Sequence, residues 1–328
     1  MVRLGIIGAG IMGERMARAA TEHAGDSVRI TGMWDPAPEA MARLAAAVPG
    51  IPAMASPDAL IEAADCVYVA SPPASHLDHA VRALAAGRAL FCEKPLAVNV
   101  AAAETFVAAN HAARAAVNFP MASSSGVDHL REWLDAGIIG TPRSLAIGVD
   151  FAAWPRSWQR DAAGWLDAPA QGGFTREVAS HFLFLTRHLL GAMVLDQARA
   201  EFPLPGRSER RIDARLTAGG IPVSLSGGVG TTERDDRNSW TLTGDRGAIR
   251  LRDWSIAERH TGGDWEPAAD AQPNERMRPL VLTRQLAGVA RMTAGKPHHL
   301  ATLVEALDVQ RVVEAILAAQ SDDATIGG

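Results

Sequence analysis

The first 120 residues alternate short apolar segments with alanine-rich amphipathic segments, and this alternation constrains the fold more than any other feature of the sequence. A short apolar run between turn residues predicts a buried strand, whereas apolar residues three and four apart predict a helix. The predicted strands are 2–7, 28–34, 66–70, 88–92 and 115–119, and the predicted helices are 11–23, 37–48, 75–87 and 99–112. Strands crossed over by helices form a parallel sheet, so residues 1–120 are predicted to be a doubly wound α/β domain.

After Pro120 the pattern changes, and residues 121–328 are predicted to form a second, α+β domain with a mostly antiparallel open sheet. Alternating segments on either side of Gly219-Gly220 predict one hairpin, and the turn at 244–247 predicts another. The remaining predicted elements are a strand at 143–151, an irregular loop at 152–170, and helices at 124–136, 174–190, 276–293 and 300–319.

The charge and the cysteine content indicate which kinds of partner the chain can bind. The chain has 32 basic and 37 acidic residues without blocks of either sign, which argues against nucleic acid or an anionic membrane as a partner. No signal peptide or membrane span is visible, and two cysteines without metal-ligand spacing predict neither a disulfide framework nor a metal site. We therefore expect a cytoplasmic protein that acts on a small molecule.

The segment from Gly8 to Gly13 has the G-x-G-x-x-G pattern and lies between a predicted strand and a predicted helix. In that context Gly8 permits a tight turn, Gly10 lets a pyrophosphate approach the backbone, and Gly13 allows close helix packing. With Ile11 and Met12, these glycines would present N–H groups at a helix start to phosphate oxygens. The pattern predicts a dinucleotide-binding site.

Asp35 stands at the end of the second predicted strand, 22 residues after Gly13. An acidic side chain at this place accepts hydrogen bonds from ribose hydroxyls and repels a 2'-phosphate. The next arginine is Arg43, so we predict NAD in preference to NADP.

Lys94 follows the fourth predicted strand, at the edge where doubly wound sheets bind ligands. The chain has only one other lysine, Lys296, and uses arginine at all its other basic positions. An amine can exchange a proton with a substrate hydroxyl, whereas a guanidinium does not deprotonate in proteins. The choice of lysine at this position therefore indicates a catalytic role.

With these features the chain resembles the Gfo/Idh/MocA oxidoreductase family over nearly its whole length. The resemblance rests on the glycine motif, Asp35, Ala70-Ser71-Pro72-Pro73 with His76, Glu93-Lys94-Pro95, Gly172-Gly173 with His181, the turn at 243–247 and the closing helix. It implies a first domain that binds NAD(P) and a second domain whose sheet forms a subunit interface in a homo-oligomer, a dimer or tetramer. The cofactor contacts that it implies, besides the glycine motif and Asp35, are Ser71, Pro72, Pro73, His76, Glu93, Lys94 and Trp165.

The family signature G-G-x-x-x-D-x-G-x-H, with a further Asp three residues later, is altered here. Glu177 replaces the first Asp, Ala179 the second Gly, and Phe184 the last Asp. Glu177 and His181 lie four residues apart on the predicted helix, so the carboxylate is expected to orient the imidazole or share the substrate hydroxyls. His181 is the candidate general acid or base, because an unperturbed histidine pKa of about 6.5 suits exchange near neutral pH.

The loop before this signature supplies aromatic and basic side chains as candidate substrate contacts. They are Trp154, Arg156, Trp158 and Arg160, with Arg176 in the following helix. Aromatic faces and arginine forks suit a substrate that carries a carboxylate or phosphate. The alternative is that the tryptophans pack the junction between the two domains and the arginines are solvated.

Together these features predict hydride transfer between a nicotinamide and a secondary alcohol or ketone of a sugar, cyclitol, sugar acid or related polyol. Lys94, His181 and Glu177 are the candidate catalytic residues, and all three are candidate substrate contacts as well. Two alternatives remain open at this point: a redox-neutral NAD-dependent enzyme on the same scaffold, and a non-catalytic NAD-binding sensor or regulator.

Overall fold

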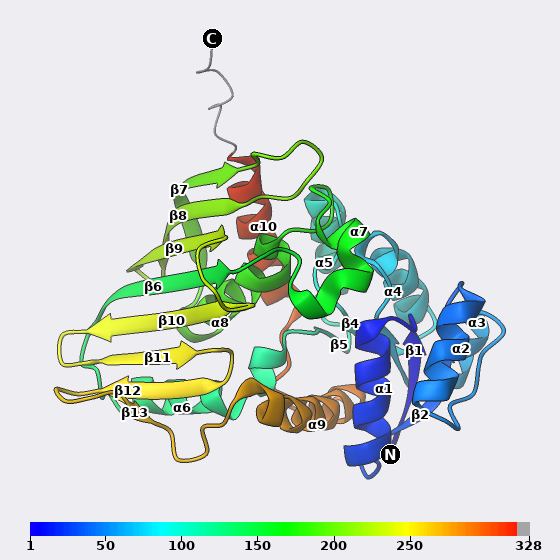
Figure 1. The fold of residues 1–328 in the computed structure, drawn as a ribbon. Helices are drawn as coiled ribbons and strands as arrows, with labels where there is room; N and C mark the ends of the chain where they lie inside the picture. Colours follow the sequence, from blue (N-terminus) through cyan, green and yellow to red (C-terminus); the bar gives the residue numbers. More distant parts are fainter. Residues whose placement is uncertain (320–328) are drawn as a thin grey trace. The chain divides into compact units, whose positions relative to one another are not determined.

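The computed structural model describes residues 1–319 and divides the chain into two compact units (Figure 1). Unit 1 contains Met1–Ser123 and Arg278–Leu307, and unit 2 contains Ser124–Met277 and the residues from Asp308 onward. The chain thus enters unit 1 twice. Each unit is described separately below.

Unit 1 is built on a five-stranded parallel sheet with the strand order β2-β1-β3-β4-β5. Its strands are β1 (Val2–Ile7), β2 (Val28–Trp34), β3 (Cys66–Val69), β4 (Ala89–Cys92) and β5 (Ala115–Val117). Its helices are α1 (Ile11–His23), α2 (Pro38–Ala47), α3 (Pro57–Ala63), α4 (His76–Ala85) and α5 (Val100–Asn110), with short turns η1 (Pro73–Ser75) and η2 (Pro120–Ser123). The order reverses between β2 and β3, on either side of β1, so ligands are expected at the carboxyl ends of these strands.

The predicted α/β class of unit 1 is confirmed, and the predicted strand and helix positions agree with the structure to within two residues. Asn99 caps α5 as predicted, since its side chain accepts a hydrogen bond from the Ala102 N–H. Helix α3 was not predicted. It is only seven residues long and begins at a serine cap followed by proline, Ser56-Pro57, which is too short for a helical repeat to be visible in the sequence.

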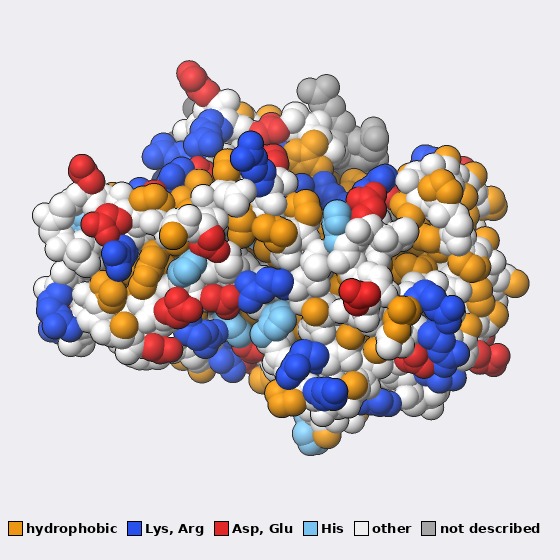
Figure 2. Space-filling model, turned by 90° about the horizontal axis from the view of Figure 1, so that it is seen from below, with side chains coloured by type: hydrophobic (Ala, Val, Ile, Leu, Met, Phe, Trp, Pro, Cys, Tyr) orange, Lys and Arg blue, Asp and Glu red, His pale blue; other side chains and the backbone are white. Residues whose placement is uncertain are grey.

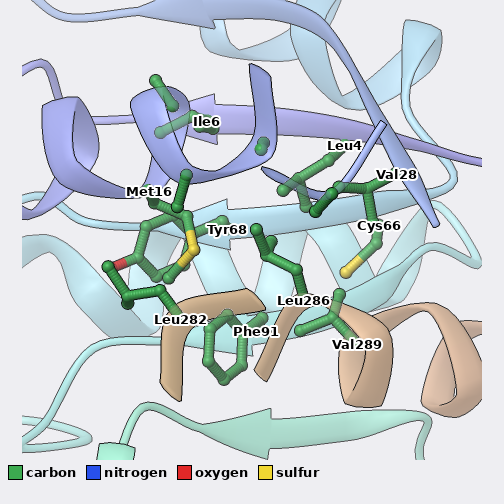
Figure 3. Packing of buried hydrophobic residues seen from close by; sticks show 14 of the residues in the cluster. Leu4, Ile6, Met16, Val28, Cys66, Tyr68, Phe91, Leu282, Leu286 and Val289 are labelled. Carbon is green, nitrogen blue, oxygen red and sulfur yellow. The ribbon is translucent and has the colours of Figure 1, made fainter. Parts of the chain in front are cut away.

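Residues 278–307 were predicted to belong to the second domain, but the structure packs them into unit 1. Helix α9 (Asn274–Thr293) contributes Leu282, Leu286 and Val289 to the buried cluster that includes Tyr68 and Phe91 of the sheet. Figure 3 shows these α9 side chains against the strand residues. Burial of an apolar helix face against the sheet is the physical reason for this assignment.

Unit 2 contains an eight-stranded sheet with the order β13-β12-β11-β10-β6-β9-β8-β7 (Figure 1). Its strands are β6 (Pro142–Phe151), β7 (Met193–Glu201), β8 (Arg211–Ala218), β9 (Ile221–Val229), β10 (Arg237–Gly244), β11 (Ala248–Arg252), β12 (Ile256–His260) and β13 (Glu266–Pro267). Only the β6–β9 pair is parallel, so the prediction of a mostly antiparallel sheet is confirmed. Both predicted hairpins are present, as β8–β9 and β10–β11.

The helical parts of unit 2 lie before, within and after the sheet. They are α6 (Ser125–Asp135), η3 (Ser157–Ala162), α7 (Ala163–Leu166), a π-helix η4 (Thr175–Ala179) that continues into α8 (Ser180–Leu190), and the part of α10 (Leu303–Ala318) that follows Leu307. Helix α6 packs on β11 and β12, and α8 on β8. Strands β7, β12 and β13 were not predicted, because polar residues interrupt their apolar alternation.

No helix among residues 1–319 is long and apolar enough to cross a membrane, and no cluster of metal-binding side chains occurs there. On the face shown in Figure 2, basic side chains form several small groups with acidic side chains between them. This distribution matches the mixed charge pattern of the sequence.

Candidate functional site

The turn after β1 has the conformation that its glycines predict. Gly8 has a φ of +107°, and a Cβ atom on it would lie 2.5 Å from the Ala70 carbonyl carbon. A Cβ on Gly13 would lie 2.0 Å from the Gly8 carbonyl oxygen. Both positions therefore require glycine for the fold itself, because no side chain has room there.

Gly10 differs from these two glycines, because nothing lies within 4 Å of the place where its Cβ would be. It is the N-cap residue of α1, and as a glycine it has no side chain that could accept a hydrogen bond from the first turn of that helix. Ile11 is exposed and Met12 is half-buried at the same helix start. Open space beside uncapped N–H groups at a helix N-terminus is the environment that a pyrophosphate requires, so the residues present fit a dinucleotide.

Asp35 lies directly after β2 and is tied to the glycine turn. Its Oδ2 accepts a hydrogen bond from the Ala9 N–H at 2.8 Å, and its Oδ1 accepts one from the Ala37 N–H at 2.9 Å. A carboxylate oxygen has more than one lone pair, so each can still accept from a ribose hydroxyl. The two backbone bonds fix the carboxylate at the strand end.

The segment after β3 contains three of the predicted cofactor contacts. Ser71 is half-buried and Pro72 is exposed, whereas Pro73 is buried at the start of η1. Pro73 therefore packs inside unit 1, which speaks against the predicted direct contact with the cofactor.

His76 was also predicted to contact the cofactor, and here the structure indicates a different role. The side chain is fully buried, with Nδ1 2.7 Å from the Pro95 carbonyl oxygen and Nε2 2.7 Å from the Ser71 carbonyl oxygen. Burial lowers the pKa of this imidazole, against the opposing effect of the two carbonyls. His76 thus lies between the segment after β3 and the segment after β4, and a neutral imidazole donates to one of the two carbonyls.

Lys94 follows β4 and is half-buried, and its neighbour Glu93 is buried. The Glu93 N–H donates to the Val69 carbonyl, so the chain still runs parallel to β3 at this point. Tyr68 and Asn118 both donate hydrogen bonds to Glu93 Oε1. The predicted cofactor contact at Glu93 is therefore opposed by the structure, because this side chain faces the protein interior.

In unit 2, Gly172 and Gly173 form a tight turn over a buried carboxylate. Gly173 has a φ of +99°, and a Cβ on it would lie 2.2 Å from Glu209 Oε2. Glu209 Oε1 accepts hydrogen bonds from both the N–H and the hydroxyl of Thr175, each at 2.7 Å. Burial raises the pKa of Glu209. The carboxyl group thereby holds the start of the helical segment that contains Glu177 and His181.

That segment begins as a π-helix and not as the regular α-helix predicted for 174–190. Glu177 lies in the π-helical turn and is half-buried, while His181 lies in the first turn of α8 and is 9% exposed. The His181 ring meets Trp254 edge to face, with centroids 5.4 Å apart. The π-turn changes the angular spacing between Glu177 and His181 from that of the predicted regular α-helix.

Phe184, at the position of the family's last aspartate, is fully buried and stacks on His188 with centroids 5.1 Å apart. The position that would carry a carboxylate thus belongs to the core of unit 2. An aromatic core residue therefore stands where the family pattern has an acidic group.

Two side chains of the loop that were predicted to contact substrate are buried and form bonds with other residues of unit 2. Trp154 is 7% exposed, donates from Nε1 to the Leu166 carbonyl, and packs on Phe151. Arg156 is also 7% exposed, and its guanidinium donates to Gln159 and to Asp236. Both side chains serve the packing of unit 2, so the prediction that they bind substrate is not supported.

Arg176 is engaged in the same way. Its Nε and Nη2 donate to the two carboxylate oxygens of Glu314, each at 2.7 Å, and Nη1 donates to the Pro169 and Gly172 carbonyls. This bidentate pair links the π-helix to α10. The guanidinium is held by the protein, which contradicts its predicted role as an anion fork for substrate.

Trp158 and Trp165 are the exposed aromatic residues of this region, at 44% and 41%. The Arg156 guanidinium lies over the Trp158 ring, 4.8 Å from its centroid. The side chain of Arg160 lies outside the described residues. Trp158 and Trp165 therefore remain the candidates for a ligand contact in the loop.

Several polar residues at these sites were not singled out from the sequence. Tyr68 and Asn118 contact Glu93, Gln285 contacts Asn118, and Glu209 supports the glycine turn. A buried polar side chain leaves no local pattern, since its partners come from distant parts of the chain. The single tyrosine and the position of Asn118 at a strand end were the only available hints.

Comparison with protein-family models matches residues 2–119 to the family described as "Oxidoreductase family, NAD-binding Rossmann fold" and labelled GFO_IDH_MocA. The match covers the chain from β1 to just beyond β5, which includes the glycine turn, Asp35 and Lys94.

Among relatives, the chain is 35% identical over 150 residues to inositol 2-dehydrogenase 3 of Saccharopolyspora erythraea, covering 43% of each chain. It is 30% identical over 198 residues to 2,7-anhydro-N-acetylneuraminate hydratase of Escherichia coli, covering 58% of this chain and 50% of the relative. The chain thus spans about half the length of the relatives that it matches.

Among solved structures, an oxidoreductase from Agrobacterium radiobacter in complex with NAD+, L-tartaric acid and magnesium has a TM-score of 0.82 and 18% identity. The alignment covers 97% of this chain and 96% of that one. At this level of identity the likeness establishes the fold of both units.

Proposed function

We propose that this chain belongs to the Gfo/Idh/MocA oxidoreductase family, whose NAD-binding Rossmann model matches residues 2–119, and that it transfers a hydride between a nicotinamide and a secondary alcohol or ketone. The observation that carries the proposal is the edge of the unit 1 sheet. There the open backbone at Gly10 and the fixed carboxylate of Asp35 follow β1 and β2, and Lys94 follows β4. A phosphate-binding turn and an amine at one sheet edge suit a dinucleotide-dependent reaction at a hydroxyl.

The remaining candidate cofactor contacts of unit 1 have separate parts in holding the dinucleotide. Gly8 and Gly13 shape the turn, and the backbone of Gly10, Ile11 and Met12 binds the pyrophosphate. Asp35 accepts from the ribose hydroxyls, and Ser71 and Pro72 border the nicotinamide end. When bound, the nicotinamide supplies the hydride acceptor or donor.

Lys94 is proposed to hold the reacting oxygen and to exchange its proton, because an amine, unlike a guanidinium, can both donate a hydrogen bond to that oxygen and transfer a proton. In unit 2, His181 is proposed as the second acid or base, and Glu177 as a substrate contact that also orients the imidazole. The burial of His181 and its edge-to-face contact with Trp254 limit the movement of its ring, which suits a group that exchanges a proton with a bound substrate.

The proposed cofactor is NAD in preference to NADP. Asp35 is followed by Pro36, and the next basic residue along the chain is Arg43. The two backbone hydrogen bonds keep the Asp35 carboxylate in place, where it would repel that phosphate.

The proposed substrates are sugars, cyclitols and related polyols, a class to which the name of the Saccharopolyspora relative also points. Exposed aromatic side chains such as Trp158 and Trp165 suit the apolar faces of such rings. A sugar acid stays within the proposal, although the engagement of Arg156 and Arg176 with protein partners weakens the case for an anionic substrate.

A second candidate is a redox-neutral reaction in which the cofactor is reduced and reoxidised within one cycle. It is favoured by the 30% identity to a protein named a hydratase. The third reading, an NAD-binding sensor or regulator without catalysis, is retained only for the case in which no turnover is found.

We also propose that the protein is a homo-oligomer, a dimer or tetramer, in the cytoplasm. Strands β8 and β9 alternate buried and exposed residues, so one face of the unit 2 sheet is solvated in the monomer. Both cysteines are free, as suits a reducing compartment. Sedimentation analysis would test the assembly, and a monomer at micromolar concentration would contradict it.

The activity is tested by titrating the purified protein with NAD and NADP in thermal-shift assays and then screening polyols, inositols, sugars and sugar acids for NADH formation. Lys94→Met should abolish turnover and retain NAD binding, with Lys296→Met as the matched control. Turnover retained in Lys94→Met would contradict the assignment of Lys94. Tight NAD binding without net NADH would favour the redox-neutral or sensor reading.

A further inference from the structure

Glu93, the residue before Lys94, carries a carboxylate that the protein holds in its interior. The side chain is 8% exposed, and its Oε1 accepts hydrogen bonds from the Tyr68 hydroxyl and, at 2.6 Å, from Asn118 Nδ2. Tyr68 and Asn118 are themselves 0% and 1% exposed. Two donors that converge on one oxygen require that oxygen to be an acceptor, which a carboxylate provides.

The orientation of the Asn118 amide determines whether it can serve Glu93. An amide that turned over would direct its Oδ1 at the carboxylate, and two acceptors would then face each other. Gln285 prevents this, because its Nε2 donates to Asn118 Oδ1 at 2.6 Å. Gln285 thus fixes the Asn118 donor toward Glu93.

Gln285 comes from α9, 167 residues along the chain from Asn118, and is completely buried. It lies on the same helix as Leu282 and Leu286, which pack against Tyr68 in Figure 3. Its Oε1 has no hydrogen-bond partner within the described part of the chain. Burying an amide with one unsatisfied polar atom costs free energy of folding. The bond from Gln285 to Asn118 offers a reason for an amide at this buried position.

The backbone around Glu93 is fixed as well. The Glu93 N–H donates to the Val69 carbonyl of β3 at 2.9 Å, and the Asn118 N–H donates to the Cys92 carbonyl of β4 at 2.7 Å. The peptide that leads into Lys94 is therefore held by β3, by the end of β5 and, through Asn118, by α9. A catalytic side chain needs such support, because small displacements of a reacting group cost rate.

We propose that Tyr68, Asn118 and Gln285 are positioning residues for Lys94. By holding the Glu93 side chain, they fix the backbone from which the lysine projects. The positioning itself is a statement about unit 1, and its catalytic consequence rests on the proposed function. Gln285 is the most informative member, since its hydrogen bond is to Asn118 and reaches Glu93 only through that residue.

The composition of the chain allows both ends of this network to be observed by NMR. Tyr68 is the only tyrosine, so protein that contains tyrosine labelled with 13C at Cζ gives one signal, and its chemical shift reports on the hydroxyl hydrogen bond. Lys94 and Lys296 are the only lysines, so reductive methylation with 13C-formaldehyde gives two lysine signals. Lys94→Arg identifies the Lys94 signal, and Lys296 is an internal control in the same spectrum.

The variants are Gln285→Met, which keeps the side-chain length but removes the donor, and Tyr68→Phe, which removes only the hydroxyl. Thr293→Val is the matched control. Thr293 is a buried polar residue on the same helix whose hydroxyl donates to the Val289 carbonyl within the helix, outside this network. Thermal melts of all variants identify any that do not fold.

We expect Gln285→Met to move the Tyr68 signal and to shift or broaden the Lys94 methyl signal, with the Lys296 signal unchanged. Tyr68→Phe should change the Lys94 signal in the same way, which keeps the test decisive if Gln285→Met does not fold. Thr293→Val should move neither signal. A Tyr68 signal that moves while Lys94 stays would overturn the positioning role, and an unmoved Tyr68 signal in folded Gln285→Met would overturn the network.

Kinetics supply the second arm, with NAD as the binding probe and the substrate found in the screen. Gln285→Met should lower kcat at least about threefold and leave the NAD dissociation constant within about twofold of wild type. An unchanged kcat would contradict the catalytic consequence. Absence of turnover in the wild type would overturn the proposed function alone, because the two spectroscopic readouts do not depend on catalysis.

Discussion

Gly10 and Gly13 lie in the same turn but meet different surroundings, and this separates a binding residue from a folding residue. A Cβ on Gly13 would overlap the Gly8 carbonyl oxygen at 2.0 Å, whereas a Cβ on Gly10 would meet no atom within 4 Å. Gly10 also has an extended backbone that alanine adopts without strain. The fold therefore does not require glycine at residue 10, and the space there suits the proposed contact with a pyrophosphate.

We predict that Gly13→Ala lowers the free energy of unfolding by about 1–3 kcal/mol, as overpacking does. Gly10→Ala should change it by less than about 0.5 kcal/mol and should weaken NAD binding at least about tenfold, which is ~1.4 kcal/mol. Denaturant unfolding and NAD titration of both variants provide the measurements. Equal NAD affinity of wild type and Gly10→Ala would contradict the phosphate-binding role.

His76 leads to a prediction about pH, because burial lowers its pKa below the ordinary value of 6.5. The unfolded chain then takes up a proton at a higher pH than the folded chain, so the stabilising contribution of neutral His76 is lost as the pH falls below about 6.5. We expect His76→Gln to be destabilising by about 1–3 kcal/mol near pH 8, through loss of a buried hydrogen bond, and less so near pH 5.

Urea unfolding of wild type and His76→Gln at several pH values measures this difference. His298→Gln is the control variant. Burial also lowers the pKa of His298, but this histidine does not lie between the segments that follow β3 and β4. A difference between wild type and His76→Gln that grows on acidification would show that His76 is protonated in the folded protein.

At the scale of elements, the π-helix Thr175–Ala179 is held from two sides. Glu209 accepts from Thr175 at its start, and Arg176 forms the bidentate pair with Glu314 of α10. The paired side chains are 11% and 24% exposed, so the interaction is only partly screened by solvent. The pair thus fixes the segment that presents Glu177 and His181.

We predict that Arg176→Met lowers the free energy of unfolding by about 1–3 kcal/mol, since it leaves the Glu314 carboxylate partly buried and unpaired. The double variant Arg176→Met/Glu314→Leu should recover part of that loss. The KM for the substrate found in the screen should change by less than about twofold. A large rise in KM with unchanged stability would restore Arg176 as a substrate contact.

At the scale of the whole molecule, the chain leaves unit 1 after Ser123 and returns to it at Arg278. The returning segment completes the core, since Leu286 is 0% exposed within the cluster that contains Tyr68 and Phe91. Leu280 on the same helix is 53% exposed. The stability of the dinucleotide-binding unit therefore depends on residues that lie beyond the whole of the second sheet in sequence.

Leu286→Ala should lower the free energy of unfolding by about 2–5 kcal/mol, through lost apolar burial and the remaining cavity. Leu280→Ala should change it by less than about 0.5 kcal/mol. Denaturant unfolding compares the two, and saturating NAD should restore part of the Leu286→Ala stability by binding the folded state. Equal costs for the two variants would contradict the packing of α9 in unit 1.

The sequence by itself determined the strands and helices of unit 1, the glycine turn, the place of Asp35 and Lys94 at the ends of strands, and both glycine-turn hairpins. These features are local: a period of two or of 3.6 residues, a glycine that needs a positive φ, and a cap next to its helix are all encoded within about ten residues. The altered signature at Glu177 and Phe184 was likewise visible from residue types alone.

Only the tertiary structure decided which arginines are engaged, how His76 is used, where residues 278–307 pack, and that Gln285 supports Asn118. Arg156 and Arg176 seemed available in the sequence because their partners Asp236 and Glu314 are 80 and 138 residues away. Hydrogen bonds and apolar contacts between distant segments follow from packing in three dimensions, which no local period records. The chemistry of single residues is thus readable from the sequence, whereas their partners are set by the fold.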